Sequence, residues 1–295
     1  MTPLEIGMLL LLSLLWGGSF FFVEILVPVL PPLTIVFVRV ALAAIVLWAI
    51  VLATHVERPT RLKDWGDLVI IGLLNNALPF CLIVWGQTQI ESGLASILNA
   101  TTPLFTILVA GALLADENLT RTKLVGVMLG LTGVIGLIGP DALSGFSGSL
   151  LGQLAVMGAA LSYAFAGVFA RRFSKNGISP LMVATGQVTM AALLLLPLTL
   201  WIDGVAFGPY LSVTTIGALL GLALFSTVLA YILYFKLIAS AGATNAALVT
   251  FLIPVSAIAL GATFLGERLT PTQFVGAALI GAGLLVIDGR VFSRS

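Results

Sequence analysis

Apolar runs of about 20 residues recur along the whole chain, and they restrict its fold more than any other sequence feature. A helix of that length crosses the hydrocarbon core of a bilayer, which is about 30 Å thick. Only 8% of the residues are charged, against about a quarter in a soluble domain, so the chain cannot cover a water-exposed surface. The runs lack the alternation of barrel strands. The sequence therefore predicts an all-α integral membrane protein embedded in the lipid bilayer.

Ten transmembrane helices are expected, separated by turn-forming residues such as Gly and Pro. The predicted spans are 5–27, 33–54, 67–88, 94–115, 121–139, 150–171, 180–201, 213–235, 244–265 and 271–289. The longest polar stretch, about 53–66, is too short for a catalytic domain outside the membrane. Regular glycines in the fifth and tenth spans indicate close helix packing.

The second half of the chain repeats the first at a spacing of about 150 residues. The segment 116–120 (DENLT) aligns with 266–270 (GERLT). Because each half holds five spans, the copies enter the membrane in opposite directions. Two inverted five-helix repeats, residues 1–140 and 147–295, are therefore predicted. Repeats of this kind build transporters whose substrate site lies near the bilayer midplane, between the halves.

Lys and Arg residues lie almost entirely on one side of this predicted topology. Eleven of the 13 follow even-numbered spans: Arg58, Arg61, Lys63, Arg121, Lys123, Arg171, Arg172, Lys175, Lys236, Arg290 and Arg294. The opposite connections hold only Arg268, and Arg39 lies within the second span. Cytoplasmic loops carry the excess of basic residues, so cytoplasmic N- and C-termini are predicted.

The composition argues against several classes of function. A net charge of +1 without a basic patch predicts no nucleic-acid partner. The single cysteine, Cys81, excludes an internal disulfide and a thiolate metal cage. No carboxylate pair, His cluster or Cys nucleophile lies on the spans, so we expect no enzyme, catalytic residues, metal or cofactor. A scaffold or receptor would not require an inverted repeat lined by polar groups, and a monomer would suffice for transport.

Polar and aromatic side chains at mid-depth are the candidates for a solute pathway, because unpaired polar atoms in hydrocarbon cost several kcal/mol each. The predicted substrate-binding residues are Trp16, Ser19, Phe20, Asn75, Asn76, Pro79, Asn99, Thr101, Ser162, Tyr163, Phe225 and Tyr231. Two interpretations stay open for the adjacent amides Asn75 and Asn76: a wet cavity, or hydrogen bonds between helices. Pro79 either frees a helix carbonyl for a ligand or only kinks the helix.

Charge within the spans is nearly absent. Glu24 and Arg39 lie near the same predicted external side and could form an ion pair, either structural or gating. No carboxylate lies at mid-depth, which favours uncoupled or weakly coupled movement of a neutral or zwitterionic solute. The groups of a zwitterion would then meet amides, hydroxyls and backbone carbonyls rather than formal charges.

The chain resembles the EamA type of the drug/metabolite transporter superfamily. The resemblance rests on LWGGSF at 15–20, on Pro32 to Arg39, and on the boxes at 103–120 and 254–270. The second box matches the family pattern fully, and the first has Asp and Asn where the pattern has Gly and Arg.

This resemblance implies two inverted five-helix repeats in a bacterial inner membrane. The chain is also similar to the YddG-type exporters of aromatic and other neutral amino acids. This similarity implies a secondary transporter that exports such amino acids and related metabolites as its small-molecule substrates, by alternating access. The alternative is a permease for another small neutral metabolite or drug.

Overall fold

The computed structural model describes residues 1–114, 120–138, 148–204 and 212–288, and these ranges contain helices joined by short loops and no strand. The helices, with η marking π-helical segments, are α1 (Pro3–Leu26), α2 (Pro32–Ala53), α3 (Leu62–Gly72), η1 (Leu73–Ala77), α4 (Leu78–Gln87), α5 (Ser92–Asn99), α6 (Thr102–Leu113), α7 (Arg121–Ile138), α8 (Gly148–Lys175), α9 (Pro180–Ile202), α10 (Val213–Leu220), η3 (Gly221–Leu229), α11 (Ala230–Ala241), α12 (Ala243–Ala246), α13 (Val249–Leu260), η4 (Gly261–Leu265) and α14 (Pro271–Asp288).

Several helices begin at residues whose side chains satisfy the free backbone N–H groups of the first turn. At α1, the Glu5 N–H donates to Thr2 Oγ1 and the Thr2 N–H donates to the Glu5 carboxylate, which is a capping box. The hydroxyl of Ser179 caps α9 and that of Ser212 caps α10 in the same way. Pro at the first turn of α1, α2 and α9 fits the same rule, because those positions need no N–H donor.

Seven helical segments of the described chain are long and apolar enough to cross a membrane. They are Pro3–Leu26, Pro32–Ala53, Leu62–Gln87, Ser92–Leu113, Ser149–Lys175, Pro180–Ile202 and Val213–Ala241. Val249–Leu265 and Pro271–Ile287 are shorter apolar helices. Large apolar side chains such as Ile45 and Trp201 stay exposed on the outside, as contact with lipid requires. The chain is a multi-pass, all-α membrane protein, as predicted.

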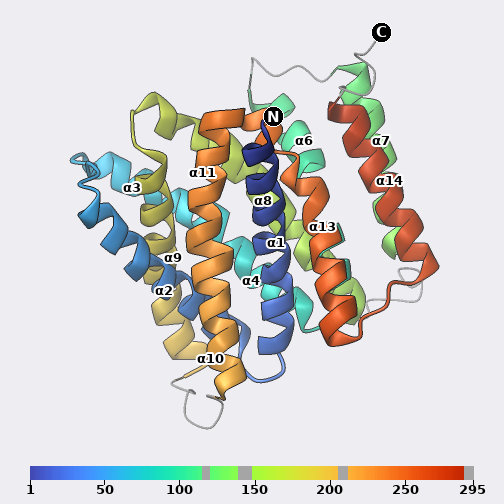
Figure 1. Cartoon of the computed structure of the whole chain (residues 1–295), viewed down its shortest axis with the longest axis horizontal. Helices are drawn as coiled ribbons and strands as arrows, with labels where there is room; N and C mark the ends of the chain where they lie inside the picture. Colours follow the sequence, from blue (N-terminus) through green and yellow to red (C-terminus); the bar gives the residue numbers. More distant parts are fainter. Residues whose placement is uncertain (115–119, 139–147, 205–211, 289–295) are drawn as a thin grey trace.

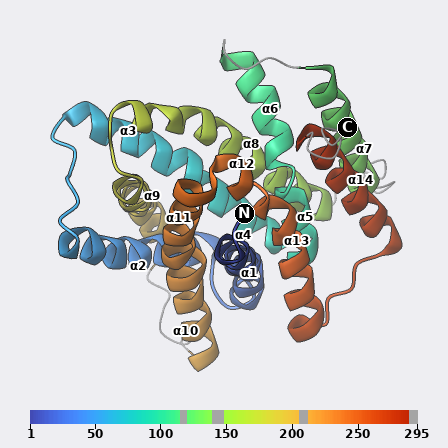
Figure 2. The same ribbon diagram turned by 45° about the horizontal axis from the view of Figure 1, so that its top comes forward.

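Helices from the two halves of the chain pack against each other throughout the bundle (Figures 1 and 2). Helix α1 packs against α13, α2 against α9, α4 against α8, and α7 against α14. Each pair joins one helix from before residue 140 to one from after it. The interface between the halves therefore runs through the centre of the molecule.

Helices α7 and α14 lie side by side at one edge of the bundle in both views (Figures 1 and 2). A Cβ added at Gly126 would lie 2.6 Å from the carbonyl oxygen of Gly283, and one at Gly133 would lie 2.7 Å from that of Gly276. The two backbones therefore touch, which only glycine permits. The packing role expected for the glycines of the fifth and tenth spans is confirmed.

Side-chain contacts also join the halves where α2 and α5 begin. The Asp203 carboxylate accepts hydrogen bonds from Thr34 N and Oγ1, both at 2.8 Å. The Glu267 carboxylate accepts three, from Ser92 N at 3.0 Å, Ser92 Oγ at 2.9 Å and Gly93 N at 3.0 Å. Both carboxylates thus lie at helix N-termini, where free N–H groups and the helix dipole favour negative charge.

The opposite end of the bundle carries contacts between α3 and α8. Arg172 Nη1 donates to Asp67 Oδ1 at 2.9 Å, and Asn176 Nδ2 donates to Asp64 Oδ1 at 3.3 Å. The halves are therefore tied by polar contacts at both ends, with the candidate site between them.

Candidate functional site

Two π-helical segments interrupt the bundle near its centre. Segment η1 covers Leu73–Ala77 and η3 covers Gly221–Leu229, which is about the repeat spacing of 150 residues further along. Single π-turns inside α-helices occur frequently at functional sites. Side chains bond to carbonyls of both segments: Ser162 Oγ donates to Leu74 O at 2.7 Å, and Thr227 Oγ1 donates to Leu222 O at 3.0 Å.

The adjacent amides of η1 both reach helices of the second half. Asn75 Nδ2 donates to Gln187 Oε1 on α9 at 3.1 Å, and Asn76 Nδ2 donates to the Tyr231 hydroxyl on α11 at 2.9 Å. Asn76 is fully buried, and its Oδ1 has no hydrogen-bond partner among the described residues. Interhelical bonding is therefore present, and one strong acceptor is left over.

Arg39 on α2 lies in the same region. Its side chain is buried, at 6% exposed, and its Nε–H donates to Thr227 Oγ1 of η3 at 2.9 Å. The guanidinium carbon lies 3.7 Å from the centre of the Phe80 ring, which is a cation–π contact. Thr227 lies about one helical turn before Tyr231, the hydrogen-bond partner of Asn76. Arg39 thus joins the polar network at the seam between the halves.

The expected ion pair between Glu24 and Arg39 is not formed in the structure. Glu24 instead accepts a hydrogen bond from Gln87 Nε2 at 3.0 Å, and the same amide donates to the Phe20 carbonyl at 2.9 Å. Arg39 contacts Thr227 and no carboxylate of the described chain. Helix rotation explains the difference, because closeness of the helix ends does not determine which way each side chain points.

Aromatic side chains lie beside this network. The Trp16 ring packs against Tyr234 with centres 5.2 Å apart, and Phe20 is buried in the core around α1. Tyr163 is partly buried and packs against two hydrophobic clusters, one around α1 and α13 and one around α2 and α9. Phe225, in contrast, is 53% exposed and belongs to no buried cluster of the described residues.

The remaining predicted residues are spread more widely. Pro79 is buried just after η1, where its missing N–H leaves the Asn75 carbonyl without its α-helical donor. Ser19 is partly buried and has no hydrogen-bond partner among the described residues. Asn99 and Thr101 lie at the break between α5 and α6, where Thr101 Oγ1 donates back to Leu98 O at 2.6 Å. The structure brings Asn75, Asn76, Ser162 and Tyr231 together around η1. Tyr163 packs against the hydrophobic cluster that contains Tyr231 and Phe80, the ring in contact with Arg39. Among the described residues, no hydrogen bond joins Asn99 or Thr101 to this group.

Three residues outside the predicted site belong to the network: Phe80, Gln187 and Thr227. A fourth, Gln87, bonds instead to Glu24 and to the Phe20 carbonyl. The two glutamines and Thr227 carry a usable signal, because each is a polar residue inside an apolar span. Phe80 carries none, since a Phe in an apolar span is the usual core residue.

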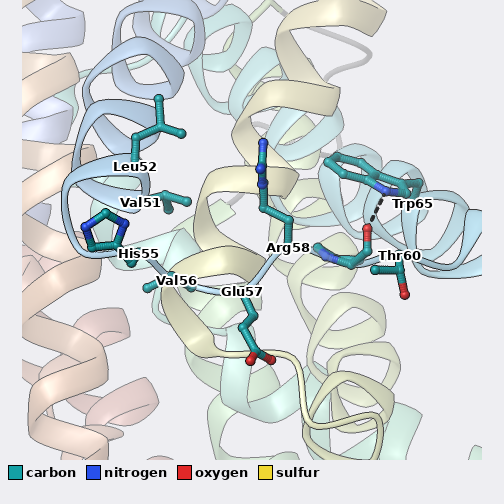
Figure 3. Close-up of a pocket in the computed structure, with 9 residues that line it drawn as sticks. Val51, Leu52, His55, Val56, Glu57, Arg58, Thr60 and Trp65 are labelled. Atoms are coloured by element: carbon teal, nitrogen blue, oxygen red, sulfur yellow. Dashed lines mark hydrogen bonds between the residues drawn. The ribbon is translucent and has the colours of Figure 1, made fainter.

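Two open hollows lie at opposite ends of the bundle. The first, of about 690 Å³, lies where α2 joins α3 and is lined by Val51, Leu52, His55, Val56, Glu57, Arg58, Pro59, Thr60 and Trp65 (Figure 3). Trp65 lies across this hollow from His55, and its Nε1–H donates to the Pro59 carbonyl at 3.1 Å. The second, of about 320 Å³, is lined by Gly93, Ile258, Ala262, Glu267, Arg268, Leu269 and Phe274. Neither contains a predicted substrate residue, so the candidate site rests on the buried polar network.

A sequence profile of the EamA-like transporter family matches residues 3–139 and, a second time, residues 150–288. The chain belongs to this family. The resemblance to the drug/metabolite transporter superfamily is thereby confirmed. Residues 116–119 of the first repeated box lie outside the described residues, and Thr120 at its end accepts a hydrogen bond from the Lys123 N–H.

Several related proteins are similar to this chain over nearly their whole length. A probable amino-acid metabolite efflux pump of Escherichia coli (strain K12) is 30% identical over 284 residues, covering 94% of this chain and 92% of the relative. The protein of the same name in Salmonella typhimurium is 31% identical over 286 residues, with the same coverage. The uncharacterized inner membrane transporter YedA of E. coli (strain K12) is 29% identical over 276 residues, covering 93% of this chain and 87% of YedA.

A solved crystal structure also matches the whole chain. It superposes with a TM-score of 0.69 at 17% sequence identity and covers 100% of this chain and 99% of its own. At that identity the match supports the fold alone. Together, the profile and the relatives make this protein a membrane transporter.

Proposed function

We propose that this transporter exports neutral, especially aromatic, amino acids and related metabolites across the inner membrane. The observation that carries the proposal is the buried polar network between the halves, with a free Asn76 Oδ1 at its centre. Two relatives named as probable amino-acid metabolite efflux pumps support the choice of substrate class. Aromatic groups beside the network, Trp16, Phe20 and Tyr163, would accommodate a bulky substrate side chain.

We further propose ten membrane crossings arranged as two inverted repeats, residues 1–140 and 147–295. The double match of one family profile supports this, because each match covers about one half. The positions of η1 and η3 support it as well, since they recur at the repeat spacing. The pairing of α2 with α9 and of α7 with α14 joins equivalent helices, as a pseudo-two-fold axis would require.

Cytoplasmic N- and C-termini follow from the distribution of Lys and Arg. A cysteine at position 61, placed in a Cys81→Ala background, tests this orientation. It should react with a membrane-impermeant thiol reagent only after the cells are opened. Labelling from outside in intact cells would contradict the proposed topology.

Alternating access would require the contacts at the two ends of the bundle to open in turn. Glu267 with Ser92 and Asp203 with Thr34 join the halves at the proposed external end. The Arg172–Asp67 pair joins them at the proposed cytoplasmic end. The Arg172–Asp67 pair is small enough to be broken and remade during transport, because Arg172 is 46% exposed and such pairs contribute about 1 kcal/mol or less.

Counterflow of labelled amino acids in proteoliposomes tests the proposed activity. Liposomes loaded with unlabelled phenylalanine should accumulate labelled phenylalanine transiently, and protein-free liposomes should not. Absence of counterflow for every member of a broad panel of amino acids would refute the proposal. Exchange of other neutral metabolites or drugs, without amino acids, would favour the alternative of a different permease.

The same preparation tests energy coupling. Since no carboxylate lies at mid-depth, an imposed pH step should change flux only weakly under a fixed substrate gradient. Uphill accumulation that is driven by the pH step and lost in Glu24→Gln would show that Glu24 carries protons.

A further inference from the structure

The buried guanidinium of Arg39 lacks the partner that a charge inside a membrane protein normally has. Intramembrane charges usually pair with one another or mark a substrate pathway. Within the described chain, Arg39 has one hydrogen bond, from Nε to Thr227, and one ring contact, to Phe80. No carboxylate of the described residues forms a salt bridge with it. The N–H groups on both terminal nitrogens therefore remain available to a ligand.

A free acceptor lies in the same small region. The buried Asn76 Oδ1 has no partner, while its Nδ2 donates to the Tyr231 hydroxyl at 2.9 Å. Tyr231 lies four residues after Thr227, the hydrogen-bond partner of Arg39, and so about one helical turn from it. Phe80, which supports the guanidinium, lies four residues after Asn76 and so about one helical turn away. The partners of the cation, Thr227 and Phe80, thus each lie about one helical turn from the hydrogen-bonded pair Asn76 and Tyr231.

We propose that Arg39 binds the carboxylate of the substrate and that Asn76 Oδ1 accepts a hydrogen bond from its ammonium group. The planar fork of an arginine matches a carboxylate and binds it through paired N–H groups. The site is thereby specific for α-amino acids over amines and alcohols of the same shape. This assignment rests on the proposed function, and it replaces the expectation that neutral groups alone meet a zwitterion.

A purely structural role makes a different prediction. In that case Arg39 only ties α2 to η3 through Thr227, and its removal would weaken transport of every solute alike. A carboxylate-binding role instead changes the ratio between solutes with and without a carboxylate. The ratio of inhibition by solutes with a carboxylate to inhibition by solutes without one therefore distinguishes the two roles, even for a variant that is less stable.

The experiment measures how unlabelled analogues inhibit counterflow of labelled L-phenylalanine. L-Phenylalaninol keeps the ammonium group and lacks the carboxylate, whereas 3-phenylpropionate keeps the carboxylate and lacks the ammonium group. With the wild-type protein, L-phenylalaninol should inhibit at least about tenfold more weakly than L-phenylalanine, as loss of a charge-assisted hydrogen bond predicts. In Arg39→Gln the two should differ by no more than about twofold, and Arg39→Lys should retain part of the discrimination. The exposed Arg61→Gln is the matched control and should keep the wild-type ratio.

Equal inhibition of the wild-type protein by L-phenylalanine and L-phenylalaninol would overturn this inference while leaving the proposed function intact. Loss of transport in Arg39→Gln with an unchanged ratio, accompanied by a lower melting temperature, would also overturn it in favour of the structural role. If Arg39→Gln does not fold, the wild-type ratio and Arg39→Lys still decide. No counterflow of any amino acid by the wild-type protein would instead refute the proposed function.

Discussion

Replacing Glu267 by Ala should destabilise the protein by about 2–4 kcal/mol, because its carboxylate caps helix α5 from the other half of the chain. Three hydrogen bonds would be lost, from Ser92 N, Ser92 Oγ and Gly93 N. Ser92 is fully buried, so water cannot replace the acceptor of its N–H, and such an unsatisfied group costs about 1–3 kcal/mol. Loss of the charged cap at the helix N-terminus adds about 1 kcal/mol.

Glu91→Ala is the matched control, because Glu91 occupies the N-cap position of the same helix without forming a side-chain cap. The unfolding free energy of Glu267→Ala, Glu91→Ala and the wild-type protein can be compared by reversible unfolding in mixed micelles. Hydrogen–deuterium exchange at Ser92 and Gly93 reports the cap directly and should accelerate only in Glu267→Ala. A loss below about 0.5 kcal/mol, with exchange unchanged, would refute the capping argument.

Three further predictions concern other parts of the molecule. Asn76→Ala should lower counterflow at least about tenfold if its free Oδ1 binds substrate, while loss of the hydrogen bond to Tyr231 should lower stability by only about 1 kcal/mol. The exposed amide variant Gln89→Ala should match the wild type, and a loss of transport no larger than the loss of folded protein would favour packing alone. Gly126→Val should lower the unfolding free energy by more than about 2 kcal/mol, because a Cβ there meets the α14 backbone. Gly136→Val, at a position with open space around it, should be near neutral, and similar losses for both variants would contradict direct contact of α7 and α14. Glu91 lies between spans, and partial burial, followed by the charge of Glu267, raises its pKa. The folded state then holds the proton more tightly, so stability should fall as pH rises through the interval just above 4.5, and Glu91→Gln should flatten that slope in a pH series of melting temperatures.

The helical elements could be predicted from the sequence because membrane helices are a local property. A run of about 20 apolar residues bounded by Pro, Gly or charged residues has one stable form in lipid, the helix, which satisfies its own backbone groups. The boundaries of α1, α2 and α9 accordingly lie within a few residues of the predicted ranges. The π-helical segments η1 and η3 were not predicted, because apolar run length does not distinguish a π-turn from an α-turn.

The candidate site was predictable only in part. Polar residues at mid-depth mark it in the sequence, since burial of an amide in an apolar span needs a compensating contact. Their partners were not predictable, because Asn76 and Tyr231 are separated by 155 residues. Likewise, the exposure of Phe225 and the burial of its neighbour Ser226 depend on how η3 is rotated in the bundle.

The sequence alone determined that this chain is an all-α membrane protein of the EamA-like family, because apolar run length and repeated motifs are carried by the chain itself. The partner of Arg39, in contrast, follows from the packing of the helices. The short connection between α1 and α2 suggested Glu24, yet α2 packs so that Arg39 contacts Thr227, 188 residues away, and the ring of Phe80. The physical reason is that a helical side chain's direction depends on the rotation of its helix, which packing against the other half of the chain fixes.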